Sequence, residues 1–240
     1  MNLEYINIDG IPLGLYKDGP VGASVSGGAD SAIMLYLLMK YIPQDLHIYN
    51  LIKDRRRHAL EKPFDAVVAK CAELTGKQNF FVHKLYGANT SPESIFNYHK
   101  EKLDQGQVDL IYFGLTKFPP NEVFEQWEEK LSWSHIKLRQ DDGIPRPLFG
   151  VNIPMPEDES LVDPAITING KIKKVNADSR IYVPFVNYNK RDIAKIYKAE
   201  GVEQELFPVS RSCENDDHPN GHCGKCWWCG ERRWGFGYLE

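Results

Sequence analysis

Residues 21–31 read VGASVSGGADS, and this stretch decides the fold. The apolar run 21–25 ends at Gly27-Gly28, which is typical of a buried strand that meets a tight turn. A helical pattern follows over residues 30–41 and closes before Pro43. Strand, glycine turn and helix in this order predict an α/β unit whose helix N-terminus can bind an anion.

The same alternation continues along the chain. Apolar patterns predict further strands at residues 46–52, 79–85, 108–115 and 182–186, and helices at 60–74, 91–103, 121–130 and 190–200. Asn169-Gly170 between two apolar pairs predicts a hairpin over residues 166–172. Alternating strands and helices indicate an α/β fold, a Rossmann-like and mostly parallel sheet with helices on both faces.

Composition sets the domain organisation and the expected compartment. The chain has 240 residues, 42 % of them hydrophobic and 26 % charged, as in a soluble globular protein. We expect a main domain over residues 1–205, with an insertion at 117–178 that covers the substrate, and a small module at 206–240. The longest apolar run is too short to span a bilayer, and the N-terminus has no basic segment, so the cytoplasm is the expected compartment.

The segment Ser26-Gly27-Gly28-Ala29-Asp30-Ser31 is the candidate phosphate loop. Glycines let the backbone approach a ligand closely, and hydroxyls and amide N–H groups can donate to phosphate oxygens. Asp30 suits the positive end of the helix dipole and could help to hold Mg²⁺. A Walker A loop needs a lysine that is missing here. A plain turn whose serines and aspartate cap the helix is the alternative.

Four of the five cysteines, Cys213, Cys223, Cys226 and Cys229, crowd into one short segment. Overlapping C-x2-C pairs with a fourth cysteine upstream predict a structural zinc site. An iron–sulfur cluster is the rival, because thiolates also suit iron. Cys71 lies on the apolar face of a predicted helix and is expected to be core.

The loop resembles the Ser-Gly-Gly-x-Asp-Ser signature of the PP-loop ATP pyrophosphatases, which have the fold of the adenine nucleotide alpha hydrolases. That resemblance implies that Ser26, Gly27, Gly28, Asp30 and Ser31 bind ATP, and that ATP is split between its α and β phosphates. Pyrophosphate leaves, and an adenylated substrate remains.

The tail CGKCWWCGER, together with Ser212-Cys213, resembles the zinc motif of the 7-cyano-7-deazaguanine synthase family. Enzymes of that family use ATP and ammonia to turn a carboxylate into a nitrile, in queuosine biosynthesis. The resemblance extends to a lysine-led helix, here begun by Lys190. Gly114, which follows the fourth strand, is also expected to contact ATP.

Lys190 and Arg211 are predicted to act in catalysis with Asp30. Lys190 begins a helix at the carboxyl edge of the sheet, where the phosphate loop also lies, and Arg211 would be held in place by the cysteine module. A solvated lysine beside Arg191 is the alternative. The expected cofactors are ATP, Mg²⁺ and Zn²⁺.

The substrate side departs from the family, because Gly114-Leu115-Thr116-Lys117 replaces its Gly-x-Asn stretch and Asp54-Arg55-Arg56 replaces a Tyr-Gly-Gln. We therefore expect an ATP-dependent, AMP- and pyrophosphate-forming ligase that joins ammonia to the carboxylate or carbonyl of another small molecule. Two alternatives stay open: sulfur transfer to a nucleobase or adenylylsulfate chemistry, and a zinc-bearing binding module with an inactive nucleotide site. The net charge of −4 argues against nucleic acid as a general partner. No membrane partner is expected, and a homodimer stays open.

Overall fold

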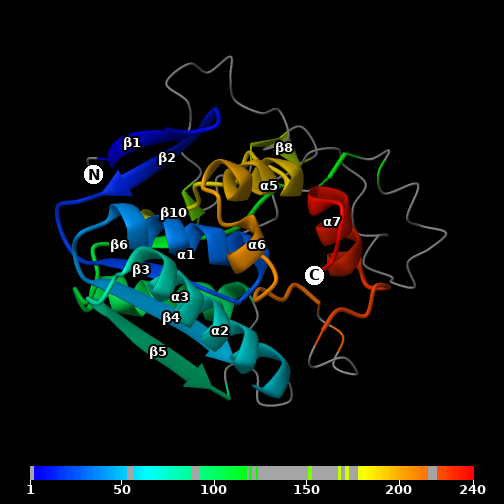
Figure 1. Ribbon diagram of the computed structural model, residues 1–240. Helices are drawn as coiled ribbons and strands as arrows, with labels where there is room; N and C mark the ends of the chain where they lie inside the picture. The colour runs from blue at the N-terminus through cyan, green and yellow to red at the C-terminus, as the bar shows by residue number, and fades with distance from the viewer. Residues whose placement is uncertain are drawn as a thin grey trace.

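The computed structural model describes residues 3–52, 57–87, 92–117, 119–120, 123, 151–152, 167–168, 171–172, 178–213, 215 and 221–240. A parallel sheet in the order β5-β4-β3-β6-β10-β7 forms its centre (Figure 1). Its strands are β3 (Val21–Ser24), β4 (Leu46–Ile52), β5 (Phe80–Tyr86), β6 (Leu110–Phe113), β7 (Val151–Asn152) and β10 (Asp178–Tyr182). The predicted Rossmann-like α/β class is confirmed.

The strand order places a topological switch point beside β3. From β3 the chain moves outward through β4 to β5, and then returns to place β6 on the opposite side of β3. Ligands of open parallel sheets bind outside the carboxyl ends of the strands at such a point. The loop after β3 holds the Ser-Gly-Gly-x-Asp-Ser sequence.

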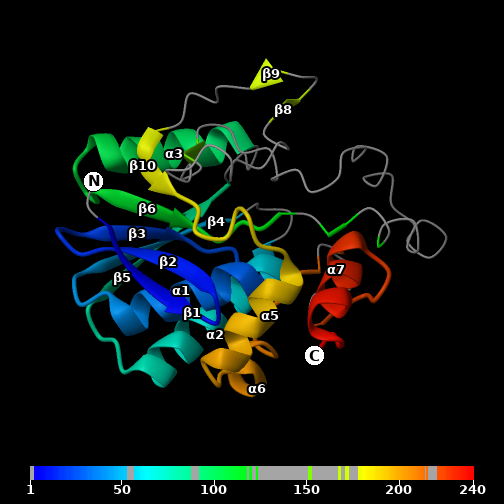
Figure 2. The same cartoon turned by 90° about the horizontal axis from the view of Figure 1, so that it is seen from above.

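Helices cover both faces of the sheet (Figure 2). One face carries the main core, which includes α1 (Ala29–Tyr41), α2 (Arg57–Thr75), α5 (Lys190–Ala199) and α6 (Glu203–Leu206). The other face packs under α3 (Pro92–Asp104). Helix α1 is buried on almost every side, because its sequence is apolar all round and α2 and α5 pack against it.

Three smaller elements complete the described structure. The hairpin of β1 (Leu3–Ile8) and β2 (Ile11–Tyr16) turns at Asp9-Gly10, both with positive φ. A second hairpin pairs β8 (Thr167–Ile168) with β9 (Lys171–Ile172), as the Asn-Gly dipeptide predicts. Helix α7 (Trp227–Phe236) packs on α5.

One predicted strand is wrong, and one predicted helix and most of the predicted insertion lie outside the described residues. The strand predicted at 182–186 is wrong: β10 ends at Tyr182, and residues 184–187 form a turn. Phe185 in that turn and Val183 just before it are fully buried, so the apolar residues there indicate burial rather than a strand. The helix predicted at 121–130 and most of the 117–178 insertion lie outside the described residues. Among the helices that the structure describes, none has the length and apolarity needed to cross a membrane.

Candidate nucleotide site and cysteine cluster

The backbone of the loop requires glycine at two places. Gly27 has φ +85°, and a Cβ there would lie 2.9 Å from the backbone nitrogen of Phe64 in α2. A Cβ on Gly114, which follows β6, would lie 2.8 Å from Ser31 Cα. The loop therefore sits directly against α2 and the end of β6. The structure brings Gly114 to the loop, and its contact with ATP stays a prediction.

The two loop serines have different surroundings. Ser31 is buried; its hydroxyl donates to Gly28 O (3.0 Å) and accepts from Ser26 N (3.2 Å). Ser26 is exposed, and its hydroxyl lies 3.2 Å from that of Ser31 and 3.3 Å from Gly28 N. Ser31 thus shapes the loop, whereas Ser26 places a hydroxyl at its outer surface.

Asp30 and Lys190 form an ion pair at this loop. Lys190 Nζ donates to Asp30 Oδ2, which also accepts from Thr116 Oγ1 at 3.4 Å. The Lys190 side chain is 4 % exposed, which excludes the solvated alternative. Asn189 and Asp192 form a capping box that fixes Lys190 in the first turn of α5. Asp30 Oδ1 is buried and has no hydrogen-bond partner in the described part of the chain.

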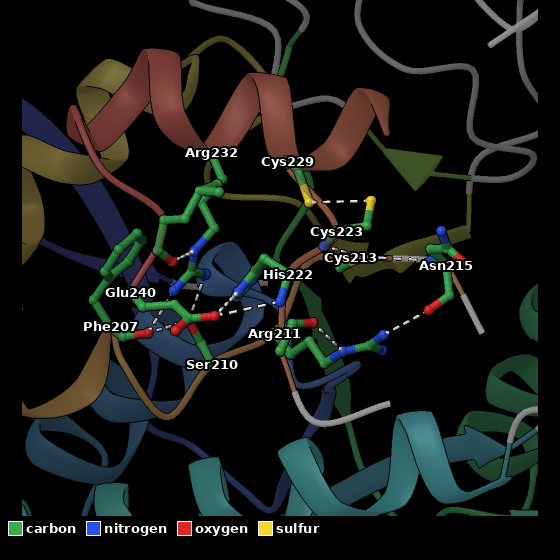
Figure 3. Close-up of polar contacts among 12 residues, drawn as sticks. Phe207, Ser210, Arg211, Cys213, Asn215, His222, Cys223, Cys229, Arg232 and Glu240 are labelled. Atoms are coloured by element: carbon green, nitrogen blue, oxygen red, sulfur yellow. Dashed lines mark hydrogen bonds and ion pairs between the residues drawn. The ribbon is translucent and has the colours of Figure 1, made fainter. Parts of the chain in front are cut away.

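Arg211 connects the loop to the cysteine segment. Its backbone N–H donates to Gly27 O (2.8 Å), while its guanidinium donates to Gly221 O (3.1 Å) and Asn215 O (3.0 Å) (Figure 3). The backbone of Arg211 therefore holds the phosphate loop, and its side chain holds Asn215 and Gly221, which lie between Cys213 and Cys223. Its predicted part in catalysis stays a prediction.

The four clustered cysteines meet in space. All four sulfur atoms lie within 4.8 Å of one another, and three of the cysteines are buried. The Sγ–Sγ distances for Cys213–Cys226, Cys223–Cys229 and Cys226–Cys229 are 3.9, 3.9 and 3.4 Å. An ion bound by four thiolates at about 2.3 Å spaces the sulfurs about 3.8 Å apart. The residues therefore fit one tetrahedral metal ion.

The clustered cysteines and Cys71 have different surroundings. Hydrogen bonds among the clustered thiols lower the pKa of Cys213 and raise the pKa of Cys229. Cys71, by contrast, is fully buried between α2 and α1, where burial raises its pKa. The prediction that Cys71 belongs to the core is confirmed.

The sequence analysis did not predict the contacts that α7 and the preceding residues 207–212 make near the phosphate loop. Arg232 is fully buried and donates to Leu239 O (2.6 Å), Ser210 Oγ (2.9 Å) and Phe207 O (2.7 Å) (Figure 3). It thereby fixes the turn that leads into Arg211.

Two more buried groups lie near the loop. Ser212 Oγ is buried beside Gly28 and has no hydrogen-bond partner among the described residues. Glu231, also fully buried, lies 4.0 Å from Lys190 Nζ. The Glu231-Arg232 pair, which follows the last cysteine after Gly230, is the sequence signal for these contacts.

A comparison with protein families finds a match at the C-terminal end of the chain. Residues 162–240 match the family described as queuosine biosynthesis protein QueC. The resemblance to that family is thereby confirmed over the last third of the chain, which holds Lys190 and the four clustered cysteines but not the phosphate loop. No curated protein matches the chain.

Two solved structures match the chain at low identity and with TM-scores below 0.5. The U34-tRNA thiolase NcsA from Methanococcus maripaludis, with its [4Fe-4S] cluster, is 14 % identical, with a TM-score of 0.39 over 94 % of this chain and 75 % of that one. NMN synthetase from Francisella tularensis is 13 % identical, with a TM-score of 0.37 over 93 % of this chain and 79 % of that one.

Proposed function

We propose that this protein binds ATP on the loop Ser26–Ser31 and transfers AMP to a carboxylate or carbonyl oxygen of a small molecule. The observation that carries the proposal is the buried Asp30–Lys190 ion pair at the switch point of the sheet, beside a glycine loop at a helix N-terminus. A buried lysine there places a cation where the leaving group of an adenylation would develop charge.

In the proposed reaction, the substrate oxygen attacks the α phosphorus, and the bond from that phosphorus to the α–β bridging oxygen breaks. Pyrophosphate leaves with the electron pair. Ammonia then attacks the activated carbon, a carbon–nitrogen bond forms, and AMP leaves. Bound Mg²⁺ would supply charge neutralisation between the phosphates.

The chain's own residues would bind and orient the triphosphate. Backbone N–H groups at the start of α1 and the Ser26 hydroxyl would donate to phosphate oxygens, and Lys190 would neutralise charge on the pyrophosphate as it leaves. The carboxylate of Asp30 would hold Mg²⁺ through Oδ1, the oxygen that lacks a hydrogen-bond partner in the described structure. No protein nucleophile is required.

The cysteine cluster would hold one structural Zn²⁺ through Cys213, Cys223, Cys226 and Cys229. Sulfur spacing near that of a single tetrahedral ion favours zinc over an iron–sulfur cluster, whose thiolates bind different iron atoms. The ion would stabilise the segment that carries Arg211 and α7, and would take no part in the chemistry.

Sulfur transfer is the weaker candidate. It would need a reactive cysteine near the nucleotide, and Cys71, the one cysteine of the chain outside the cluster, is buried with a raised pKa.

Product analysis tests the proposal. The protein is incubated with ATP, Mg²⁺, ammonia and a panel of carboxylates, deazapurine carboxylates included, and AMP, ADP, pyrophosphate and phosphate are quantified. We expect AMP and pyrophosphate to appear together with one class of acceptor. Formation of ADP and phosphate, or bound ATP that no acceptor consumes, would contradict it.

A further inference from the structure

Lys190 lies between two carboxylates that come from different parts of the chain. Asp30 belongs to the phosphate loop, whereas Glu231 belongs to α7, directly after the cysteine cluster. The side chains of Lys190 and Glu231 are 4 % and 0 % exposed, and that of Asp30 is 13 % exposed. In this water-poor setting each carboxylate has a strong influence on where the ammonium group rests.

The backbone of α7 also contacts Lys190. A Cβ on Gly235 would lie 2.5 Å from Lys190 Cβ and 2.9 Å from Lys190 O, so only glycine permits the observed approach. One turn of α7 thus contacts the main chain of Lys190 through Gly235 and its ammonium group through Glu231. The position of the Lys190 side chain is therefore set by contacts with α7 as well as by its ion pair with Asp30 in the loop.

We infer that Glu231 is a positioning residue. It holds Lys190 from the α7 side, so that the Asp30 carboxylate is available to Mg²⁺-ATP. The inference rests on the proposed function. A buried ammonium group needs acceptors for its protons, and a nearby carboxylate also balances its charge. When Asp30 binds the metal ion, it shares its charge with that ion, and Glu231 then keeps the ammonium group in place next to the phosphates.

The substitution Glu231→Gln removes this second anion and nearly preserves shape. Lys190 would then draw more on the charge of Asp30, and the Asp30 carboxylate would be less available to Mg²⁺. Affinity for Mg²⁺-ATP should therefore fall, by about tenfold. Affinity for ATP in EDTA should stay equal or rise, because the substitution removes a negative charge near a site for a polyanion.

The experiment measures binding of a non-hydrolysable ATP analogue by calorimetry, with Mg²⁺ and with EDTA. Glu200→Gln is the matched control. Lys40 and Glu200 form a similar pair at 2.5 Å between the opposite ends of the same two helices, α1 and α5, and the Glu200 side chain is 6 % exposed. Glu200→Gln should change neither affinity. Glu231→Asp, which keeps the charge, should recover part of the loss with Mg²⁺.

Each outcome decides the question. Equal losses with Mg²⁺ and with EDTA, or no loss with Mg²⁺, would overturn the inference and leave Glu231 a packing residue. If Glu231→Gln is too unstable to study, Glu231→Asp carries the test, with a smaller loss that again is confined to Mg²⁺. If the unsubstituted protein binds no ATP analogue under either condition, the proposed function fails.

Discussion

Gly27 shows how one residue shapes the phosphate loop. Alanine there meets two separate penalties, a positive φ of +85° and a contact of 2.9 Å with the backbone of Phe64. We expect Gly27→Ala to lower the free energy of unfolding by about 2–4 kcal/mol and to weaken ATP binding.

Gly106 provides a control with only the first penalty, because φ is +67° and no atom lies within 4 Å of an added Cβ. Gly106→Ala should cost about 1 kcal/mol and leave ATP binding unchanged. Urea unfolding and calorimetry measure both quantities, and equal effects of the two substitutions would contradict close approach at Gly27.

Lys190 is the second residue on which the site depends. We expect Lys190→Ala to lower pyrophosphate release at saturating ATP by about a hundredfold, because a cation next to a departing pyrophosphate acts mainly in the transition state. Lys40→Ala breaks the Lys40–Glu200 ion pair at the far ends of the same helices and should leave turnover within about twofold. Thermal melting of each variant separates lost stability from lost chemistry. Equal loss of turnover in both variants would contradict a role for Lys190.

At the scale of elements, α7 depends on the cysteine cluster. Cys226 is its N-cap residue and makes no side-chain capping hydrogen bond, and Cys229 lies in its first turn. We expect metal analysis to find about one zinc per chain and a chelator to destabilise α7 before the sheet. Hydrogen exchange should then accelerate in α7 and in residues 207–213, which Arg232 and the Arg211–Gly27 bond connect to it, while β3 and β4 keep their protection.

Substitutions separate the cluster from other cysteines. Cys223→Ser should reproduce the effect of the chelator, whereas Cys71→Ala should keep the full metal content. Iron with visible absorption would contradict the zinc assignment, and unchanged exchange in α7 after metal removal would contradict its dependence on the cluster.

Local sequence was sufficient for most elements and insufficient for their long-range contacts. Strand β4 and helix α1 follow from their apolar runs and the turn residues beside them, and the cysteine spacing predicted the cluster of four sulfurs. Apolarity at Val183 and Phe185 suggested a strand because a buried turn has the same composition. The contacts Glu231–Lys190 and Arg211–Gly27 join segments far apart in the chain, so no local pattern records them.

For the whole molecule, the sheet separates two cores of different chemistry. The α1 side joins the larger apolar cluster to the buried Asp30–Lys190 ion pair, whereas the α3 side encloses His99 among Tyr49, Tyr98 and Phe113. His99 is fully buried and its Nδ1 lies 2.6 Å from Ile95 O, which fixes the neutral tautomer with Nδ1–H as donor. Its Nε2 is buried without a hydrogen-bond partner in the described structure, so a proton there would be poorly solvated.

Global stability should therefore depend on pH through His99. Burial lowers the pKa of His99 from 6.5 to about 4. The unfolded chain takes up a proton near pH 6.5 and the folded protein only near pH 4, so acid favours unfolding between these values. The contribution of neutral His99 to the free energy of unfolding is complete above pH 6.5. It decreases as the pH drops towards 4, by about 3 kcal/mol in all.

His99→Phe isolates this contribution, because phenylalanine keeps a ring of similar size and cannot titrate. Acid also protonates cysteine ligands, and burial lowers the pKa of His47 and His83 as well, so the stability of every variant should fall with pH. The difference between His99→Phe and the unsubstituted protein removes these shared effects. Urea unfolding at pH 7.5, 5.5 and 4.5 should show this difference shift in favour of His99→Phe by about 2.5 kcal/mol from the highest pH to the lowest. A difference independent of pH would mean that His99 accepts its proton in the folded protein as readily as in the unfolded chain, and that the α3 core admits water.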